Sequence, residues 1–365
     1  MENNATRREF GRYLHTIRTT VFEETIREFA KRLQLTPSYT HRLEHADDVN
    51  PTRKTVEQIA ERLGMDAGPF LLKAGFVPMS TLVKDSFPKI EQLFEQKRLI
   101  TGVPSGFIDL DSLTSGFQSS ELVVVAARPS MGKTAFCLNI AAHAASEGHG
   151  VAIFSLEMSK EALVQRMLTA TARVDSHRVR QGSLRDSDFT QLARAAGILQ
   201  TYQLWIDDTP SLTLLEMRSK ARRLKIDNDL KLVIVDYLQL MRSPEYAENR
   251  VQEISDISRS LKALARELEI PVIALSQLSR ASEQRGGERK PILSDLRDSG
   301  AIEQDADLVI FIHRPEYYDR EDESKRGLAE VMLAKNRNGP TGDVQLRFVR
   351  EYTRFDNMSG REEPE

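Results

Sequence analysis

The chain has 365 residues, of which 40% are hydrophobic and 29% charged, so it can bury a large core and is longer than one typical domain. Its 51 basic and 54 acidic residues give a net charge of −3, which excludes a globally basic body and restricts any nucleic-acid contact to a local patch. The single cysteine, Cys137, excludes an internal disulfide and fits a reducing cytosol. We therefore expect two unequal domains.

The sequence predicts a cytoplasmic protein with no membrane partner. From Met1 the chain runs straight into polar residues, without the apolar region of a signal peptide. No apolar run approaches the ~18 residues that a membrane-spanning helix needs.

Residues 1–76 predict a small all-α domain. Residues 1–20 are polar and basic, and we expect a short helix or a loose arm there. Three further helices follow, because apolar residues recur at helical spacing between capping residues, namely Thr25, Thr36, Pro37, Thr52 and Gly64. A short helix covers 69–74. Two short helices joined by a tight turn predict a helix-turn-helix.

The order and spacing of these helices over residues 22–76 resemble the XRE/Cro-like helix-turn-helix family. The resemblance implies that Pro37 to Leu43 is a recognition helix, with groove contacts from Ser38, Tyr39, Thr40 and Arg42. Duplex DNA would then be a partner. A helix-turn-helix retained as a protein-docking module, for instance for a loader, is the alternative, because acidic and basic residues are nearly balanced here.

Residues 77–101 read as a linker that carries an amphipathic helix from Leu82 to about Arg98. The helix is too isolated to fold alone and needs a partner surface. That surface is either the downstream domain or a neighbouring subunit.

Residues 102–365 predict an α/β domain. Apolar strands alternate with helices, and the strands are LVVVA, VAIFS, LVIVD, VIALS, LVIFI, VMLA and VQLRFV. The earlier strands are continuously apolar, as expected for a parallel sheet covered by helices on both faces. The pattern is that of a RecA-like core in outline.

The stretch from Leu122 to Leu138 combines a strand, a polar turn and a helix that opens at Lys133. It matches the phosphate-binding pattern G-x-x-x-x-G-K-[ST], except that Ala127 stands at the first glycine. Lys133 would reach the β- and γ-phosphates of ATP, and the Thr134 hydroxyl would ligate Mg²⁺. The residues expected to cradle the phosphates are Ser130, Met131, Gly132, Lys133, Thr134 and Ala135.

Three polar residues follow apolar strands and should therefore lie at one edge of the sheet. Asp236 ends LVIVD and could hold Mg²⁺. Glu157 follows VAIFS and is a candidate general base, the alternative being a carboxylate that stabilises a helix start. Gln277 follows VIALS and could sense the γ-phosphate, the alternative being a plain polar strand end.

From about Leu82 to Phe355 the sequence resembles the ATPase domain of the DnaB-type replicative DNA helicases. The shared strings, in order, are ITGVPSGFIDLDSLTSGF, VAARPSMGKTAF, FSLEMS, LVIVDYLQLM, ALSQLSR, SDLRDSGAIEQDAD and KNRNGPTG. The resemblance implies that Glu157 is the catalytic base, Asp236 the acid that binds Mg²⁺, and Gln277 the link between the γ-phosphate and the DNA-binding loops.

The resemblance also implies groups that act in trans. Lys335 and Arg337 would reach the ATP of a neighbouring subunit, with Arg337 as the arginine finger, so a homohexamer is expected. Without the resemblance they would read as solvated loop charges. The segment with Arg297, Asp298 and Gly300 resembles the loop that holds single-stranded DNA in the central channel.

The sequence thus predicts a hexameric, ATP-dependent helicase that translocates 5′ to 3′ on single-stranded DNA during replication. Because the helix-turn-helix takes the place of the family's usual N-terminal domain, we expect an origin in a phage, plasmid or other mobile element. The alternative function is a regulator that binds duplex DNA through the helix-turn-helix and uses its ATPase only to switch assembly, without unwinding.

Overall fold

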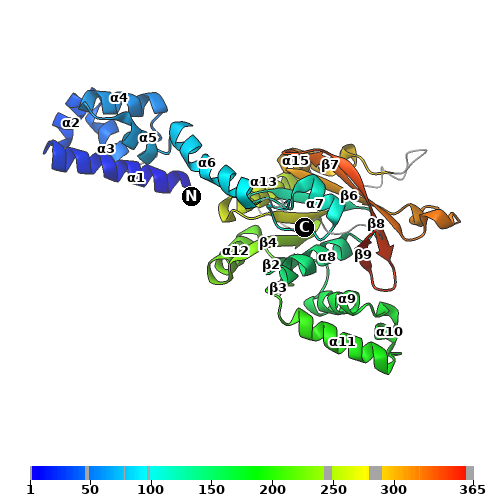
Figure 1. Cartoon of the computed structure of the whole chain (residues 1–365). Helices are drawn as coiled ribbons and strands as arrows, with labels where there is room; N and C mark the ends of the chain where they lie inside the picture. Colours follow the sequence, from blue (N-terminus) through cyan, green and yellow to red (C-terminus); the bar gives the residue numbers. More distant parts are fainter. Residues whose placement is uncertain are drawn as a thin grey trace. The chain divides into compact units, whose positions relative to one another are not determined.

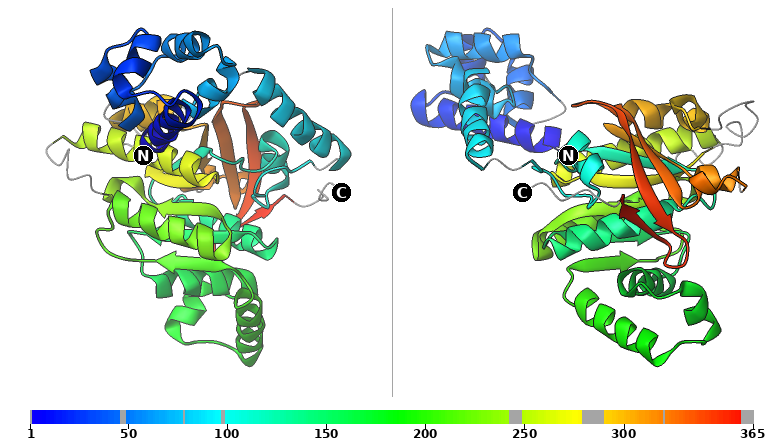
Figure 2. Two further views of the ribbon diagram at one scale, coloured as in Figure 1. Left: turned by 90° about the vertical axis from the view of Figure 1, so that its left-hand side faces the viewer. Right: turned by 45° about the vertical axis from the view of Figure 1, so that its right-hand side comes forward.

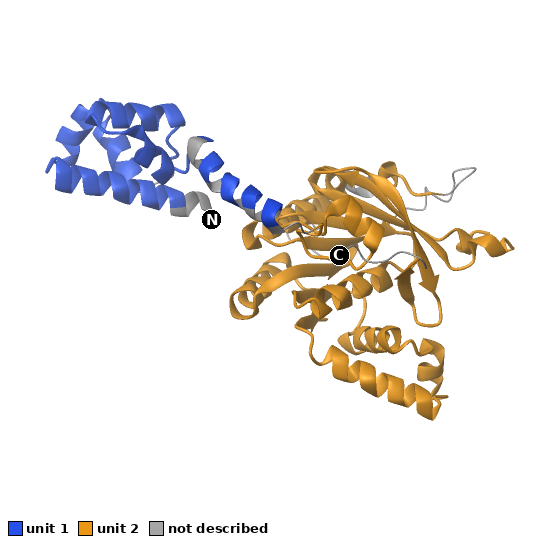
Figure 3. Ribbon diagram, in the orientation of Figure 1, with its two compact units in different colours: residues 1–97 blue, residues 98–365 orange. Residues whose placement is uncertain are grey.

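The computed structural model describes residues 2–45, 49–77, 79–96, 99–241, 249–278, 290–319 and 321–358. The chain divides into two compact units, residues 1–97 and 98–365 (Figure 3). The first contains helices alone, and the second carries the sheet (Figure 1).

Unit 1 is helical throughout its described secondary structure: α1 (Glu2–Thr16), the π-helical turn η1 (Ile17–Val21), α2 (Ile26–Arg32), α3 (Pro37–His45), α4 (Arg53–Leu63), α5 (Ala67–Lys73) and α6 (Met79–Gln96). The start and end signals behave as expected. Thr25 forms a capping box with Glu28, the Thr52 hydroxyl accepts from the Thr55 amide, and Gly64 ends α4 at φ +65°.

The loose arm expected as one possibility for residues 1–20 is wrong, because α1 belongs to the core. Phe10, Leu14 and Ile17 lie on one face and are buried with Phe29, Leu33 and Phe70. At Gly11 the helix passes so close to α3 that a Cβ would lie 2.5 Å from the Glu44 carbonyl oxygen. Glycine is what permits this approach.

Helix α6 carries large apolar side chains that unit 1 does not cover. Its exposed members include Leu82, Val83, Phe87, Ile90 and Phe94. The predicted amphipathic helix is confirmed, although it begins three residues earlier than expected.

Within the described part of unit 2, nine strands form one sheet in the order β3-β2-β4-β5-β1-β6-β7-β8-β9. Strands β1 (Leu122–Ala127), β2 (Gly150–Ser155), β3 (Leu204–Asp207), β4 (Leu230–Asp236), β5 (Val272–Gln277) and β6 (Leu308–His313) are parallel. Strands β7 (Leu328–Asn336), β8 (Gly342–Val349) and β9 (Arg354–Asn357) add an antiparallel extension.

Helices pack on both faces of the sheet, as predicted (Figure 2). Val123 and Val125 of β1 contact one core with α8 (Lys133–Ser146) and α9 (Lys160–Ala172). Leu122 and Val124 face the other core, with α12 (Leu214–Asn228) and α13 (Arg250–Leu268). This explains the continuously apolar strands, since alternate side chains serve different cores.

The remaining elements of unit 2 are α7 (Ile108–Thr114), α10 (Ser176–Gln181), α11 (Asp186–Leu199), α15 (Gly300–Asp305) and the 3-10 turns η2 (Leu238–Leu240), η4 (Leu293–Ser299), η5 (Pro315–Tyr317) and η6 (Glu323–Lys325). Two strands were not predicted, β3 and β9. Both have four residues, and β3 lies at the sheet edge with all its residues half-buried. Such short, partly exposed strands leave little apolar signal.

Candidate functional site

The four strands β2, β4, β5 and β1 are neighbours in the sheet and end at one edge. Glu157 follows β2, Asp236 ends β4, Gln277 ends β5, and the phosphate-binding turn follows β1. A cavity of about 400 Å³ lies there, lined by residues that include Gly132, Lys133, Thr134, Glu157 and Gln277. The structure thus brings together side chains from four separate segments.

The turn after β1 has the backbone conformation needed to aim its N–H groups at an anion. Ser130 and Gly132 have positive φ values of 68° and 95°, and Lys133 is the first residue of α8. A Cβ on Gly132 would lie 3.0 Å from the Phe355 ring, so glycine also relieves crowding. Ala127 is still the last residue of β1, where alanine meets no strain.

Thr134 and Asp236 are joined by a hydrogen bond of 2.8 Å from the Thr134 hydroxyl to Asp236 Oδ2. The other carboxylate oxygen, Oδ1, is buried and has no hydrogen-bond partner among the described residues. Burial raises the pKa of Asp236 above its ordinary value, and the charge of Lys133 partly offsets this. A buried oxygen without a partner beside a hydroxyl is a donor set that suits a hard cation such as Mg²⁺.

Lys133 lies at the floor of the cavity. Its Nζ is 4.5 Å from the centre of the Tyr237 ring. Burial lowers the pKa of Lys133, while the carboxylates of Asp236 and Glu157 oppose that shift. The ammonium group is thus poised for a stronger negative partner, such as a phosphate.

Glu157 is exposed on a turn that Ser155 holds in shape. The Ser155 hydroxyl accepts from the Met158 amide at 3.2 Å and donates to the Met158 carbonyl at 2.7 Å. The Leu156 amide donates to the Asp236 carbonyl at 2.7 Å. The turn therefore presents the Glu157 carboxylate to the cavity rather than to a helix start, since α9 is capped by Ser159.

Sequence reasoning missed two arginines of this region. Arg166 of α9 lines the cavity, and burial lowers its pKa. Arg314 is buried directly after β6, donates to the Ser130 carbonyl at 3.2 Å and stacks over the Phe348 ring at 3.8 Å. The strand-end rule that selected Asp236 would also have selected Arg314, whereas a helical arginine such as Arg166 leaves no comparable signal.

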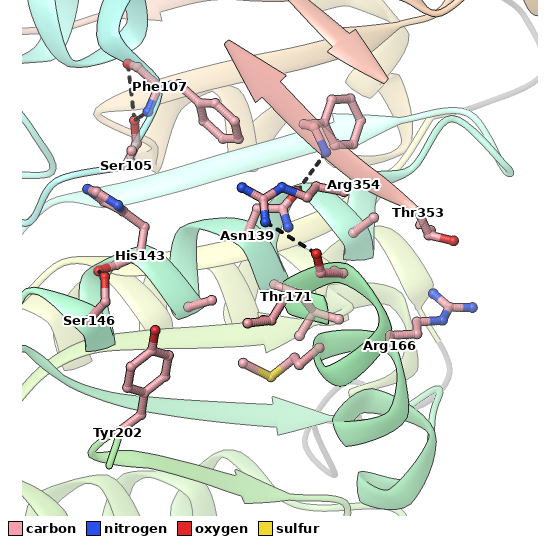
Figure 4. Close-up of a pocket in the computed structure, with 17 residues that line it drawn as sticks. Ser105, Phe107, Asn139, His143, Ser146, Arg166, Thr171, Tyr202, Thr353 and Arg354 are labelled. Carbon is pink, nitrogen blue, oxygen red and sulfur yellow. Dashed lines mark hydrogen bonds between the residues drawn. The ribbon is translucent and has the colours of Figure 1, made fainter. Parts of the chain in front are cut away.

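A second cavity, of about 210 Å³, lies beside α8 (Figure 4). It shares Ala135, Arg166 and Thr353 with the first cavity. Its polar lining includes Asn139, whose side chain accepts from the Phe355 amide at 2.8 Å. The two cavities thus adjoin along the same helix.

Lys335 and Arg337 do not line the cavity at the phosphate-binding turn. Lys335 Nζ donates to the carbonyls of Glu303 at 2.6 Å and Ala306 at 2.7 Å, around the end of α15. Arg337 donates to Asp307 at 3.1 Å. The interpretation of Lys335 as a solvated loop charge is therefore wrong.

Other predicted site residues lie apart from this edge. Arg297 and Asp298 fall in η4, and Gly300 begins α15, but their side chains lie outside the described residues. In α3, Ser38 and Arg42 are exposed and Tyr39 is half-buried. Thr40 is fully buried, and its hydroxyl donates to the Thr36 carbonyl at 3.1 Å, so the groove contact expected of Thr40 is wrong.

A phosphate-binding turn after a central parallel strand, with an acid at the end of β4, defines a P-loop nucleotide hydrolase with a RecA-like fold. The family model of the DnaB-like helicase C terminal domain matches residues 102–357. The chain therefore belongs to the DnaB-like helicases, a family of ATP-hydrolysing enzymes.

Relatives of known function agree with this assignment. The replicative DNA helicase DnaC of Bacillus subtilis (strain 168) is 46% identical over 325 residues, which are 88% of this chain and 69% of that protein. The replicative DNA helicase DnaB of Geobacillus stearothermophilus is 49% identical over 83% of this chain and 66% of its own length. The chain thus spans about two thirds of the length of these relatives.

Two solved structures also match. One is an isolated ATPase domain, which is 39% identical with a TM-score of 0.73, over 76% of this chain and 99% of that one. The other is a DnaB-like replicative helicase, studied with its interactions with primase, which is 32% identical with a TM-score of 0.74, over 95% of this chain and 88% of that one. The RecA-like fold expected from the sequence is thereby confirmed. Within the described residues no helix is long and apolar enough to cross a membrane.

Proposed function

We propose that the chain is the motor subunit of a hexameric helicase, which hydrolyses ATP to move 5′ to 3′ along single-stranded DNA and unwind duplex during replication. The observation that carries the proposal is the convergence of Lys133, Thr134, Glu157 and Gln277 around one cavity, with Asp236 bonded to Thr134. Family membership supplies the reaction, and these residues supply a role for each part of it.

Each side chain has a distinct task in hydrolysis. Lys133 would bind the β- and γ-phosphates, together with the backbone N–H groups of the turn from Ser130 to Ala135. Glu157 would accept the proton of the attacking water, because its carboxylate is exposed to the cavity. Gln277 would hydrogen-bond the γ-phosphate and report its presence to the segment that follows β5.

Thr134 and Asp236 would hold Mg²⁺. The buried Asp236 Oδ1 without a hydrogen-bond partner supports this assignment. When bound, the cation neutralises charge on the β- and γ-phosphate oxygens as it develops in the transition state.

Lys335 and Arg337 would complete the site of a neighbouring subunit. Two observations support a homohexamer: these cations lie away from their own chain's cavity, and α6 exposes apolar residues such as Phe87 and Phe94. Docking of α6 on an adjacent copy would cover that face. Hydrolysis would then depend on assembly.

Single-stranded DNA would pass the segment with Arg297, Asp298 and Gly300. Repeated backbone contacts around a ring give binding that is salt-sensitive and independent of sequence. For unit 1 we propose a helix-turn-helix role in which Ser38, Tyr39 and Arg42 contact duplex DNA or a loader protein. Their position on α3 supports this role for the side chains that are at least partly exposed.

Unwinding of a forked duplex with ATP and Mg²⁺ tests the motor proposal, with oligomer mass measured on the same samples. The parent is expected to unwind as a hexamer, and Glu157→Gln to assemble and bind ATP without unwinding. Glu161→Gln, an exposed carboxylate of α9, is the matched control and should behave as the parent. A parent that assembles and hydrolyses ATP without unwinding would overturn the motor proposal and favour the regulator.

A further inference from the structure

The inference begins where strand β5 loses one of its two neighbours. Strand β4 pairs with β5 only as far as Val235 opposite Ala274. On its other side β5 stays paired with β1 as far as Ala127 opposite Gln277. The backbone of Ser276 and Gln277 therefore needs other partners on the β4 side.

The side chain of Gln239 supplies those partners. Its Oε1 accepts from the Gln277 amide at 3.2 Å, and its Nε2 donates to the Gln277 carbonyl at 3.2 Å. Nε2 also donates to the Ser276 hydroxyl at 2.9 Å. A carboxamide carries the same donor and acceptor as a peptide group, so Gln239 extends the ladder where β4 turns away.

Gln239 is itself held in place. It lies in η2, three residues after Asp236, between the buried Leu238 and Met241. Arg250 donates to the Gln239 carbonyl and pairs with the buried Glu253 of α13. The carboxamide is therefore fixed at both its backbone and its tip, on the segment that carries Asp236.

We propose that Gln239 is a positioning residue for ATP hydrolysis, which sets the place of Gln277 relative to Asp236. The proposal rests on the proposed function of Gln277 as the contact to the γ-phosphate. Without the clamp, the end of β5 can shift while the phosphate-binding turn keeps its own contacts. Gln239 thus acts on the chemical step through Gln277 and touches neither ATP nor DNA.

Kinetics of the full chain test this role. Gln239→Ala is expected to lower the kcat of DNA-stimulated ATP hydrolysis by about 10–100-fold, the loss typical of small displacements at a site, with KM for ATP nearly unchanged. Combining it with Gln277→Ala should slow hydrolysis no further than the slower single variant. Gln252→Ala, an exposed glutamine on α13, is the matched control.

Hydrogen exchange gives a readout that does not depend on activity. In Gln239→Ala the Gln277 amide loses its acceptor, so the peptide covering 272–278 should exchange faster. Gln239→Glu keeps an acceptor oxygen and should keep that protection, while oligomer mass and melting temperature stay at parent values in both variants.

The outcomes separate the two proposals. Unchanged exchange in Gln239→Ala, or single-variant losses that multiply in the double variant, would overturn the positioning role. A parent without DNA-stimulated hydrolysis, or Gln277→Ala with parent kinetics, would instead overturn the proposed function of Gln277, even if the exchange result shows that the clamp exists.

Discussion

Arg337 donates a hydrogen bond of 3.1 Å to Asp307 within its own chain. The same carboxylate accepts from the Leu122 amide at 2.8 Å and pairs with Lys262 at 2.5 Å. The cation proposed to act on a neighbour's ATP is thus attached to the start of β1, the strand that leads into the phosphate-binding turn. A subunit's own turn and its contribution to the next site share one anchor.

Removing this arginine should separate stability from activity. The Arg337 side chain is 51% exposed, so its pair with Asp307 contributes only about 0–1 kcal/mol to unfolding, and Arg337→Ala should melt close to the parent. Hydrolysis by the assembled protein should fall by about 10³–10⁵-fold, the usual contribution of an arginine supplied in trans. Steady-state ATPase assays and thermal melts measure the two effects, with the exposed Arg347→Ala as control.

Mixing subunits distinguishes action in trans from action in cis. Arg337→Ala and Lys133→Ala are each expected to be inactive, but their mixture should regain activity. Some interfaces then join an intact phosphate-binding turn to an intact Arg337. A mixture as inactive as its components would contradict action in trans.

The sequence predicted this site where function leaves a local pattern. An acid or amide directly after an apolar strand was enough to place Asp236 and Gln277 at one edge, because parallel strands end together. Contacts between distant segments leave no such pattern. The hydrogen bonds from Gln239 to the end of β5 and from Arg314 to Ser130 depend on how separate loops fold back, which spacing alone does not reveal.

Arg314 should be needed to hold the phosphate-binding turn. Its guanidinium is buried, donates to the Ser130 carbonyl and pairs with Glu316, which also accepts from the Gly327 amide at 2.8 Å. Arg314→Ala leaves Glu316 buried without its main partner and should lower the free energy of unfolding by about 3–5 kcal/mol. KM for ATP should rise, because Ser130 loses its anchor.

The same cluster offers a matched control. Arg350 also pairs with Glu316, at 3.4 Å, but its side chain is 62% exposed. Arg350→Ala should therefore cost under about 1 kcal/mol and leave KM unchanged. Chemical denaturation and nucleotide titration of both variants measure the difference. Equal losses in the two variants would contradict the role given to burial.

Asp236 should limit the stability of the protein in the absence of nucleotide. Burial raises its pKa above the ordinary value of 3.8, so the folded state favours the protonated carboxyl. The contribution of this group to the free energy of unfolding therefore falls as pH rises from 3.8 through the raised pKa, and stays low above it. Asp236→Asn removes the charge and should melt at or above the parent temperature at neutral pH.

The same substitution should abolish the stabilisation that Mg²⁺ and ATP give together, because the carboxylate proposed to hold the cation is lost. Thermal melts with and without ligand, repeated across the acid range, check both effects. The parent should approach the Asp236→Asn variant in ligand-free stability as pH falls. A variant that is less stable than the parent throughout would contradict the account.

The last prediction concerns α3 in unit 1, where two neighbouring charged residues should behave differently. Glu44 is fully buried and accepts hydrogen bonds of 2.7 and 3.0 Å from Arg18, whereas Arg42 is exposed. Glu44→Ala leaves Arg18 without its carboxylate and should destabilise unit 1 by about 3–5 kcal/mol. Arg42→Ala should leave its stability unchanged.

Duplex DNA binding should follow the opposite logic if α3 is a recognition helix. Arg42→Ala should then weaken binding of the full chain while hydrogen exchange across α2 to α5 stays at parent protection. Glu44→Ala should raise that exchange, since it opens the core shared by α1 and α3. Parent-like duplex binding by Arg42→Ala, in a chain that binds its loader less well, would assign α3 to protein docking, because the exposed arginine would then serve a protein surface and not a DNA groove.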